Sequence, residues 1–314
     1  VRSILRQVIH SYWDVALGWE NLSIRRGALA LAQERRRITD AAIDAGTVAP
    51  TEALAVEQII TTREEEILNA ELAITERSLD LRRLAFLEVG PTAIDIKTTA
   101  TVAAPQRKFD ETELVERAVR NSPEIAALIK REAGATIEVE VASNGLLPRL
   151  DASLSFGPQG TDQTLDDAAK NLAKGRGYTI SAGLSYEQRL ANRSARGRTA
   201  RARAQSHRIQ IDLEQARRQV SLAMARAIRL ARSARRRMEL GERTIALAER
   251  NIEAEIARFE LGRATNFDVL QRQDELKQAR LRYAGATVDF LKAEATIDSL
   301  TGDLLDKYGV KIAN

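Results

Sequence analysis

The sequence has no cysteine, only six prolines and few aromatic residues, which make up 4% of its 314 positions. The lack of cysteine excludes a disulfide scaffold, thiol catalysis and a cysteine-ligated zinc site. The two histidines, His10 and His207, lie far apart in the chain, so a histidine metal cluster is not expected. No run approaches the roughly 18 apolar residues that a membrane-spanning helix needs.

Alanine, leucine, arginine and glutamate are abundant, which is the composition of long helices and coiled coils. The 48 basic residues nearly balance the 44 acidic ones, and the basic excess is concentrated in residues 189–243. Elsewhere the two signs alternate, as they do on solvated helix faces. The chain opens with Val1 and Arg2 and carries no signal peptide, so we expect a processed chain or a fragment.

Two stretches of the chain resemble each other at a separation of 216 residues. Residues 29–46 (LALAQERRRITDAAIDAG) match residues 245–262 (IALAERNIEAEIARFELG), and Gly46 aligns with Gly262. Apolar residues at spacings of three and four follow each stretch, which predicts two antiparallel coiled-coil hairpins. The predicted seam residues are Ala53, Val56, Ile60, Ile67, Ala70, Ile74, Leu81 and Leu84 in the first copy, and Val269, Leu276, Tyr283, Ala286, Phe290, Ala293, Ile297 and Leu300 in the second.

The helix expected before Gly262 is unusually long. Residues 189–261 contain no proline, and a helix of that length would extend roughly 100 Å. Such a helix cannot bury itself in a compact domain, so we expect it to lie along partner helices. Its predicted apolar stripe is Ile209, Leu213, Ala216, Val220, Ala223, Ala227, Leu230 and Ala234.

The turns of the two hairpins, residues 44–51 and 260–266, each contain a glycine that can adopt the left-handed conformation that ends a helix. Glu52 and Asp268 follow in the first turn of the next helix, where the helix dipole favours an acid. For Glu52 we expect plain capping of its own helix.

Between the helices the apolar period changes from helical to two. Residues 150–156 (LDASLSF) and 178–186 (YTISAGLSY) alternate apolar and polar side chains, which predicts two half-apolar strands with a long polar loop between them. With a residue or two added at each end, both strands approach the roughly 9–11 residues that span a bilayer. A soluble hairpin and a piece of a transmembrane barrel both fit this pattern, and the barrel requires oligomerisation because only closure satisfies every backbone group in lipid. The residues expected to face lipid are Leu150, Leu154, Phe156, Tyr178, Ile180, Leu184 and Tyr186.

The order of these elements, with the segment RFELGRATNFDVLQRQDELKQAR at residues 258–280, resembles the TolC family of outer-membrane efflux proteins. The resemblance covers nearly the whole chain. It implies a mainly α fold of long antiparallel coiled-coil helices in two structural repeats, with a transmembrane β-hairpin contributing to a trimeric twelve-stranded barrel. Since residues 1–45 match the long helix that follows a hairpin in the family, we expect an N-terminally truncated sequence that lacks the preceding helix and β-hairpin.

The resemblance also divides the chain into six segments. They are a helical hairpin of repeat 1 (1–88), an equatorial inter-repeat linker (89–108), the first helix of repeat 2 (109–147), with a break or kink expected at Pro123, an outer-membrane β-hairpin with an external loop (148–188), the long helical hairpin of repeat 2 (189–303) and a C-terminal tail (304–314).

The implied function is a passive exit duct in the outer membrane of a Gram-negative bacterium, continued by a periplasmic helical tunnel. The implied partners are two further copies of the chain, outer-membrane lipid, a periplasmic adaptor (membrane fusion) protein and an inner-membrane pump of the RND or ABC type, in tripartite efflux or type I secretion. The helical turns are the adaptor-docking tips, here Gly46, Thr47, Ala49, Gly262, Arg263, Thr265 and Asp268. Asp268 and Gln271 occupy the places of a pore-narrowing acid pair; because Gln271 is not an acid, Asp268 serves either as a gate or as a helix cap.

Three other readings remain. The arginines of 189–243 suggest a nucleic-acid-binding coiled coil, but no aromatic stacking motif interleaves with them, and no specific nucleic-acid binding is expected. An enzyme is not expected, since the sequence has no catalytic constellation, cofactor motif or metal-ligand spacing. A structural coiled-coil scaffold without channel activity fits the heptads, yet leaves the strands unexplained; it would stay soluble without detergent, whereas a duct would not.

Overall fold

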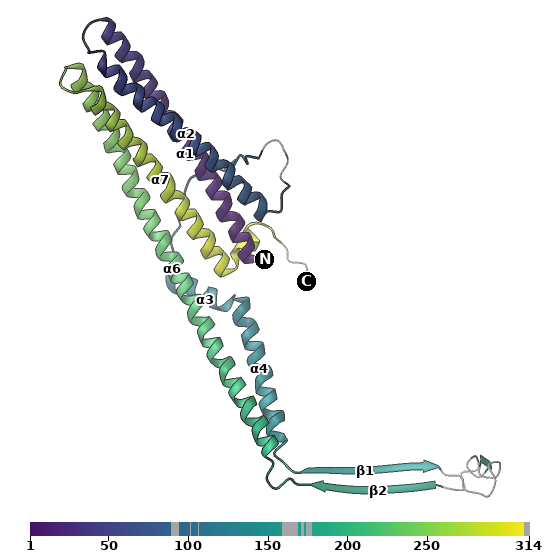
Figure 1. The fold of residues 1–314 in the computed structure, drawn as a ribbon. Coiled ribbons are helices and arrows are strands. Elements are labelled where there is room, and N and C mark those ends of the chain that lie inside the picture. The colour runs from purple at the N-terminus through teal and green to yellow at the C-terminus, as the bar shows by residue number, and fades with distance from the viewer. Residues whose placement is uncertain are drawn as a thin grey trace. The chain divides into compact units, whose positions relative to one another are not determined.

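A computed structural model describes residues 1–88, 94–100, 102–105, 107–158, 169–170, 173 and 178–310. The chain is mainly helical with one antiparallel hairpin, which confirms the predicted fold class (Figure 1). None of the helices in these ranges has an apolar stretch long enough to cross a membrane. The elements are α1 (Arg2–Asp44), α2 (Thr51–Leu84), α3 (Glu111–Arg120), α4 (Pro123–Asn144), β1 (Arg149–Pro158), β2 (Tyr178–Glu187), α6 (Arg193–Glu260), α7 (Asn266–Thr301) and α8 (Asp303–Lys307).

The chain divides into two compact units, one of Val1–Ser122 with Arg217–Asn314 and one of Pro123–Ala216. These units cut across the segments 109–147 and 189–303 that the sequence analysis delimits. The first cut lies at the break between α3 and α4, where Pro123 begins a new helix after α3 has ended at Arg120. Proline tolerates the first turn of a helix but not its interior, so this break lies at the predicted position.

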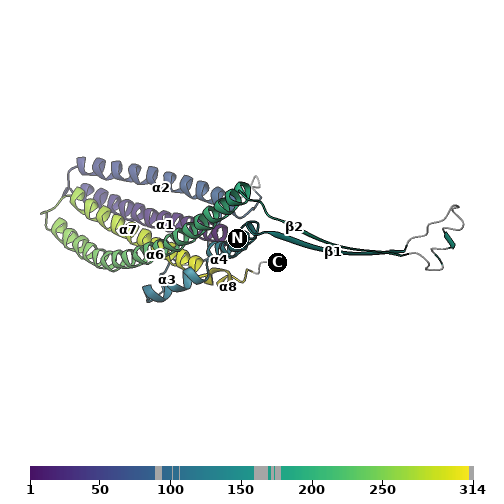
Figure 2. The same cartoon turned by 90° about the horizontal axis from the view of Figure 1, so that it is seen from below.

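In the first unit, α1 and α2 form an antiparallel hairpin, and α7 lies along α1 (Figures 1 and 2). α2, α3 and α8 also contact α7, so most residues of α7 are buried. A helix covered on several sides does not need one apolar stripe, and α7 accordingly buries polar and charged residues as well as Val269, Leu276 and Phe290.

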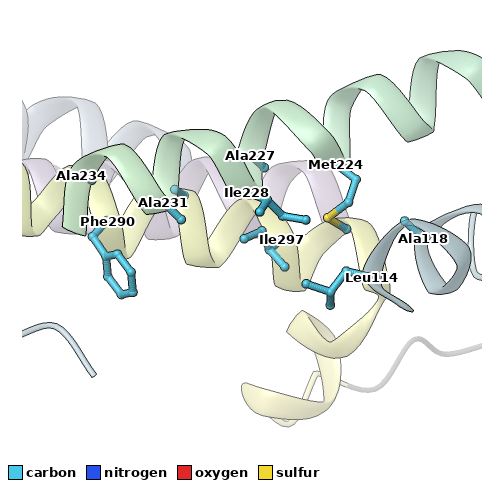
Figure 3. Packing of buried hydrophobic residues seen from close by; sticks show 10 residues of the cluster. Leu114, Ala118, Met224, Ala227, Ile228, Ala231, Ala234, Phe290 and Ile297 are labelled. Carbon is cyan, nitrogen blue, oxygen red and sulfur yellow. The ribbon is translucent and has the colours of Figure 1, made fainter. Parts of the chain in front are cut away.

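The part of α6 that belongs to the first unit packs its small side chains against α7 and α3. Met224 and Ile228 of α6 meet Phe290 and Ile297 of α7 and Leu114 of α3 in one apolar cluster (Figure 3). The cluster also contains Ala118, Ala227, Ala231, Ala234 and Ala293.

The apolar stripe predicted for α6 is partly wrong. Ala223 and Leu230 are exposed, and Met224, Ile228 and Ala231 are buried in the seam. Among the residues of α6 that face the seam are Ala216, Val220 and Met224, which are separated by two consecutive steps of four residues. A pattern that alternates steps of three and four residues therefore selects exposed positions beyond Val220. The cause is geometric, because a helix has about 3.6 residues per turn and its buried face shifts against a seven-residue repeat.

The described residues of the linker are held against the first unit by hydrogen bonds. The indole Nε1 of Trp19 donates to the carbonyl of Ile96 at 2.8 Å, and the amide of Ile96 donates to Ser78 Oγ at 3.1 Å. Arg82 donates to the carbonyl of Ile94 at 2.9 Å. The linker residues 89–93, 101 and 106 lie outside the described residues.

The segment predicted as the C-terminal tail, residues 304–314, begins within the short helix α8. Gly302, with φ 94°, ends α7 in the left-handed conformation, and the chain then turns into α8. Leu304 is fully buried against Ile9 of α1 and Ala295 of α7, so the apolar contact keeps this segment helical. Residues 311–314 lie outside the described residues.

In the second unit, α4 pairs with the first turns of α6. The hydroxyl of Thr199 donates to the carbonyl of Ala142, and the side-chain amide of Asn192 donates to the carbonyl of Gly145, both at 2.9 Å. Asn192 has a positive φ of 31°, so α6 begins at Arg193 and not at residue 189.

The strands β1 and β2 pair antiparallel, from Arg149 opposite Glu187 to Pro158 opposite Tyr178. This register brings Leu150 to Tyr186, Leu154 to Ala182 and Phe156 to Ile180, which gathers the apolar side chains on one face. The opposite face carries serine, threonine and glycine, with the charged Arg149, Asp151 and Glu187 towards the end where β1 begins. Most of the predicted external loop, from residue 159 on, lies outside the described residues.

The packing of α6 against α7 and α3 leads to a prediction about the stability of the chain when one buried aliphatic side chain is shortened. Replacing Ile228, which is fully buried, with alanine should destabilise the monomeric chain by about 2–5 kcal/mol, because it removes packed atoms and leaves a cavity. Urea unfolding followed by far-ultraviolet circular dichroism measures this loss. Leu230→Ala, two residues along the same helix and 56% exposed, is the matched control and should change the stability far less. Equal losses for the two variants would contradict the packing described here.

Candidate functional site

The turns of the two helical hairpins have the same backbone conformation. Gly46 and Gly262 adopt positive φ values of 70° and 66°. In each turn the glycine amide donates to the carbonyl three residues back, at 2.9 Å. The next amide donates to the carbonyl five residues back, from Thr47 to Ala42 at 2.9 Å and from Arg263 to Arg258 at 2.8 Å. This is the glycine-ended helix termination expected from the sequence, repeated in both tips.

The helix after the second turn begins with a reciprocal cap. The Thr265 hydroxyl accepts from the amide of Asp268 at 3.3 Å, and the Asp268 carboxylate accepts from the amide and the hydroxyl of Thr265, both at 2.8 Å. The amide of Thr265 and then its hydroxyl stabilise the charged carboxylate, so the pKa of Asp268 lies below its ordinary value. Its capping contribution is therefore present at neutral pH and is lost as the pH falls through that lowered pKa.

The expectation that Glu52 caps its own helix is wrong. No side-chain hydrogen bond caps the start of α2, and the Glu52 carboxylate instead accepts from the backbone amide of Asn266 at 3.2 Å. Asn266 begins α7, so Glu52 supplies an acceptor to the other repeat's helix terminus. Packing of Ala32, Val56 and Ile60 against Leu270 brings the two hairpins together at this level.

Behind the tips, buried charges join the two hairpins. Lys277 of α7 has a side chain only 3% exposed, and its ammonium pairs with Glu66 of α2 at 2.9 Å and with Asp274 at 2.6 Å. Arg25 of α1 pairs with the same Glu66 at 2.8 Å. Such a pair is costly to break, because removal of one partner leaves a buried charge uncompensated.

Arg63 of α2 adds a second link to this network. Its guanidinium donates to the carbonyl of Ala28 in α1 and to Gln273 Oε1 in α7, the latter at 3.4 Å. Burial lowers the pKa of Arg63 from its ordinary value, and the charges of Asp274 and Glu66 oppose that effect. A cavity of about 220 Å³ lies beside these groups, lined by Ile59, Thr62, Arg63, Glu66, Phe267, Leu270, Gln271, Asp274 and Lys277.

A second ionic cluster, which the sequence analysis missed, lies at the linker. Arg107 pairs with Glu294 at 3.1 Å and with Asp298 at 2.6 Å, and Lys307 of α8 pairs with the other Asp298 oxygen at 2.9 Å. Burial alone would lower the pKa of Arg107, but the hydrogen bonds and charges of Asp298 and Glu294 raise it. Glu294 and Asp298 are four residues apart on α7, a spacing that puts both on one face of the helix. Two acids among the buried residues of a coiled-coil seam are therefore the sequence feature that could have predicted this cluster.

The predicted site residues fall into two groups in space. Those of the tips gather around the two glycine turns, with Gln271 exposed at the cavity and Asp268 engaged in its cap. The predicted lipid-facing residues of the hairpin are all exposed, with between 61% and 78% of their surface accessible. Within the described ranges, no group of three His, Asp or Glu side chains converges as a ligand set for a metal ion.

The profile of the outer membrane efflux protein family matches residues 114–303, which run from α3 through the hairpin, α6 and α7 to the first residue of α8. The chain belongs to this family. The TolC-family recognition and the function predicted from the sequence, an exit duct for efflux in the outer membrane, are confirmed by this membership. The family is one of efflux and channel proteins.

Individual relatives agree with this assignment. The cobalt-zinc-cadmium resistance protein CzcC of Cupriavidus metallidurans is 25% identical over 319 residues, which cover 96% of this chain and 68% of CzcC. Among solved structures, the outer membrane protein VceC of Vibrio cholerae shares the fold with a TM-score of 0.69 at 16% identity, over 96% of this chain and 70% of VceC. The outer-membrane channel OprN does so with a TM-score of 0.72 at 18% identity, over 96% of this chain and 66% of OprN.

Replacing glycine with alanine should change the stability of the chain in opposite directions at Gly262 and Gly197, two positions where an added Cβ would meet no atom within 4 Å. Gly262→Ala should destabilise the chain by about 1 kcal/mol, because an L-residue is strained at φ 66°. Gly197 lies inside α6 with no atom within 4 Å of an added Cβ, so Gly197→Ala should stabilise by about 0.5–1 kcal/mol. Chemical unfolding measures both, and a stabilising Gly262→Ala would exclude the left-handed turn.

Proposed function

We propose that the chain acts as a passive homotrimeric exit duct that receives its cargo from a periplasmic adaptor and an inner-membrane pump. The observation that carries this proposal is the family match, which includes the hairpin, α6 and α7 in one continuous segment. The chemistry of the site agrees with a duct, because its features are packing surfaces and ion pairs between helices.

The hairpin supports a place in the wall of a transmembrane barrel. Its two strands hydrogen-bond to each other, and within the described residues no further strand joins either outer edge. Its apolar face is exposed, with Leu154 at 78% and Leu184 at 75%. Lipid and the strands of neighbouring subunits would cover that face and those edges, whereas a lone two-stranded hairpin is marginal in water. The hydroxyl-bearing face would then line the lumen.

Exposed leucines on the helices support assembly of the trimer. Leu54, Leu68 and Leu72 of α2 are 72%, 66% and 59% exposed, and they lie on the side of the helix that its own chain leaves uncovered. Leu222 and Leu247 of α6 are similarly exposed. A second and a third copy of the chain would bury these side chains, which gains about 25 cal/mol per Å² of apolar surface.

The two tips are the proposed contact for the adaptor, through Gly46, Thr47 and Ala49 in one turn and Gly262, Arg263 and Thr265 in the other. The Glu52 bond to Asn266 fastens the tips to each other, so an adaptor would meet both at once. Within this site we assign Asp268 a capping role, because its carboxylate already accepts two hydrogen bonds from Thr265. Gln271, exposed beside it, contributes no charge to a constriction.

The relative's printed name suggests a cargo class to test, since CzcC is a cobalt-zinc-cadmium resistance protein. We propose that this duct exports divalent transition-metal cations. A strain deleted for the gene should be more sensitive to cobalt, zinc and cadmium, by several-fold in the inhibitory concentration, and the wild-type gene should restore resistance. Sensitivity to organic dyes is the control. A deletion strain that is sensitive to dyes and not to these metals would exclude this cargo.

A tip variant tests docking separately from cargo. Phe267, 58% exposed at the start of α7, is an aromatic anchor of the kind that dominates interfaces, so Phe267→Ala should weaken adaptor binding by more than tenfold. Binding of the purified chain in detergent to the adaptor encoded with its pump measures this. Phe86→Ala truncates a phenylalanine after the end of α2 that is even more exposed, at 91%; it is the matched control and should leave the affinity unchanged. Equal affinities for both variants would argue against docking at the tips.

A further inference from the structure

The first turns of α6 carry a dense cluster of arginines without acidic neighbours in the sequence. From Gln188 to Ile211 the chain contains no aspartate or glutamate. Six arginines of α6 lie in this stretch and all are exposed: Arg193, Arg196, Arg198, Arg201, Arg203 and Arg208. In the part of the chain that the structure describes, none of these six forms an ion pair, whereas Arg232, Arg236 and Arg237 further along α6 do.

These arginines occupy the exposed side of the helix. The buried positions of the same turns are Ala195 and Thr199, which face α4. At about 100° per residue, Arg193, Arg201 and Arg208 point away from that face, and Arg196 lies at its side. Glu138 and Glu140 of α4 lie at the same level and are exposed too, but they make no ion pair with the arginines in the described structure. The positive charge is therefore directed outward.

Apolar side chains lie next to this charge, at the end of the hairpin. Leu147 and Leu190 flank the last strand pair, Arg149 with Glu187, and they are 65% and 96% exposed. Tyr186 follows on β2, and its hydroxyl donates to Gln188 Oε1 at 2.8 Å. Exposed leucines, an amphipathic tyrosine and arginines in succession are the arrangement found where a protein passes from the hydrocarbon region to the lipid headgroups.

We infer that this arginine face is a binding surface for anionic phospholipid headgroups at the periplasmic side of the outer membrane. The inference rests on the proposed function, which puts the hairpin in the bilayer and α6 on the periplasmic side. The arginines nearest the hairpin, Arg193 to Arg201, span about 12 Å of helix, so all lie within about a Debye length of the headgroups at 0.1 M salt. Guanidinium groups bind phosphate oxygens through paired hydrogen bonds, which suits a phosphodiester headgroup.

The same charge would also attract nucleic acid, but the surroundings favour lipid. Binding of single-stranded nucleic acid uses aromatic side chains between the basic ones, and residues 188–211 contain none. Exposed Leu147 and Leu190 have no role on a phosphate backbone, whereas at a membrane they insert among the acyl chains. Lipid therefore accounts for both the charged and the apolar half of this surface.

The test compares two triple variants of the full chain that remove equal charge from the same helix. Arg193→Gln, Arg196→Gln and Arg201→Gln together remove the proposed surface. The control combines Arg226→Gln, Arg229→Gln and Arg243→Gln, which are exposed arginines about 38 Å or more further along α6. A third variant replaces the first three arginines with lysine, which keeps the charge. Native mass spectrometry of the detergent-solubilised protein measures binding of phosphatidylglycerol and of phosphatidylcholine.

We expect the wild-type chain to prefer phosphatidylglycerol, and the first variant to lose roughly a hundredfold of that affinity, since each basic residue near anionic headgroups contributes about a factor of five. The control should bind like the wild type, and the lysine variant should retain most of the preference. Equal loss in the control, or a first variant that keeps its preference, would overturn the inference. So would tight binding of duplex DNA together with no preference between the two lipids.

Conductance in planar bilayers separates this inference from the proposed function. Wild-type chains that insert and conduct, but show no preference for phosphatidylglycerol, would overturn the lipid surface and leave the duct intact. The chains for this measurement are made from the whole natural coding sequence, so that any preceding helix and β-hairpin are included. If they neither insert nor conduct, the proposed function and this inference with it are overturned.

Discussion

The burial of α7 is the constraint on which the rest of the first unit depends. The helix is covered along most of its length, so its charged residues are buried with its apolar ones. A buried charge needs a partner close by, since leaving it unpaired costs several kcal/mol. Lys277, Glu294 and Asp298 thereby determine which segments must lie beside them, and each is met by an opposite charge from another part of the chain.

Those partners come from segments that are distant in sequence. Glu66 belongs to the first hairpin, Arg107 to the linker between the repeats and Lys307 to the last helix. The ion pairs thus fasten the first hairpin near the tips and the linker and C-terminal helix near the other end of α7.

The two repeats share their turns but differ in how they use equivalent acids. Glu52 and Asp268 occupy corresponding positions after Gly46 and Gly262. Asp268 caps its own helix, whereas Glu52 accepts from the terminus of the other repeat. The difference arises because Thr265 offers a hydroxyl and an amide to Asp268, whereas the corresponding residue Ala49 has no hydroxyl, and Pro50, at the N-cap of α2, has neither a hydroxyl nor an amide hydrogen to offer Glu52. The hydrogen bond from Asn266 to Glu52 thus joins the two repeats of the sequence at their tips.

The sequence by itself determined the helices, the glycine turns, the paired strands and the family, because each of these follows from local spacing: three and four for a coiled coil, two for a strand, and a glycine where φ must be positive. Only the tertiary structure decided which side of α6 is buried, where Glu52 binds and how Arg107 and Lys307 share Asp298. Those outcomes depend on which surface of one helix meets another far along the chain. The residues next to a position in the sequence do not determine which distant helix it will contact. A shift of one position, as from the exposed Ala223 to the buried Met224, is enough to change a side chain from exposed to buried.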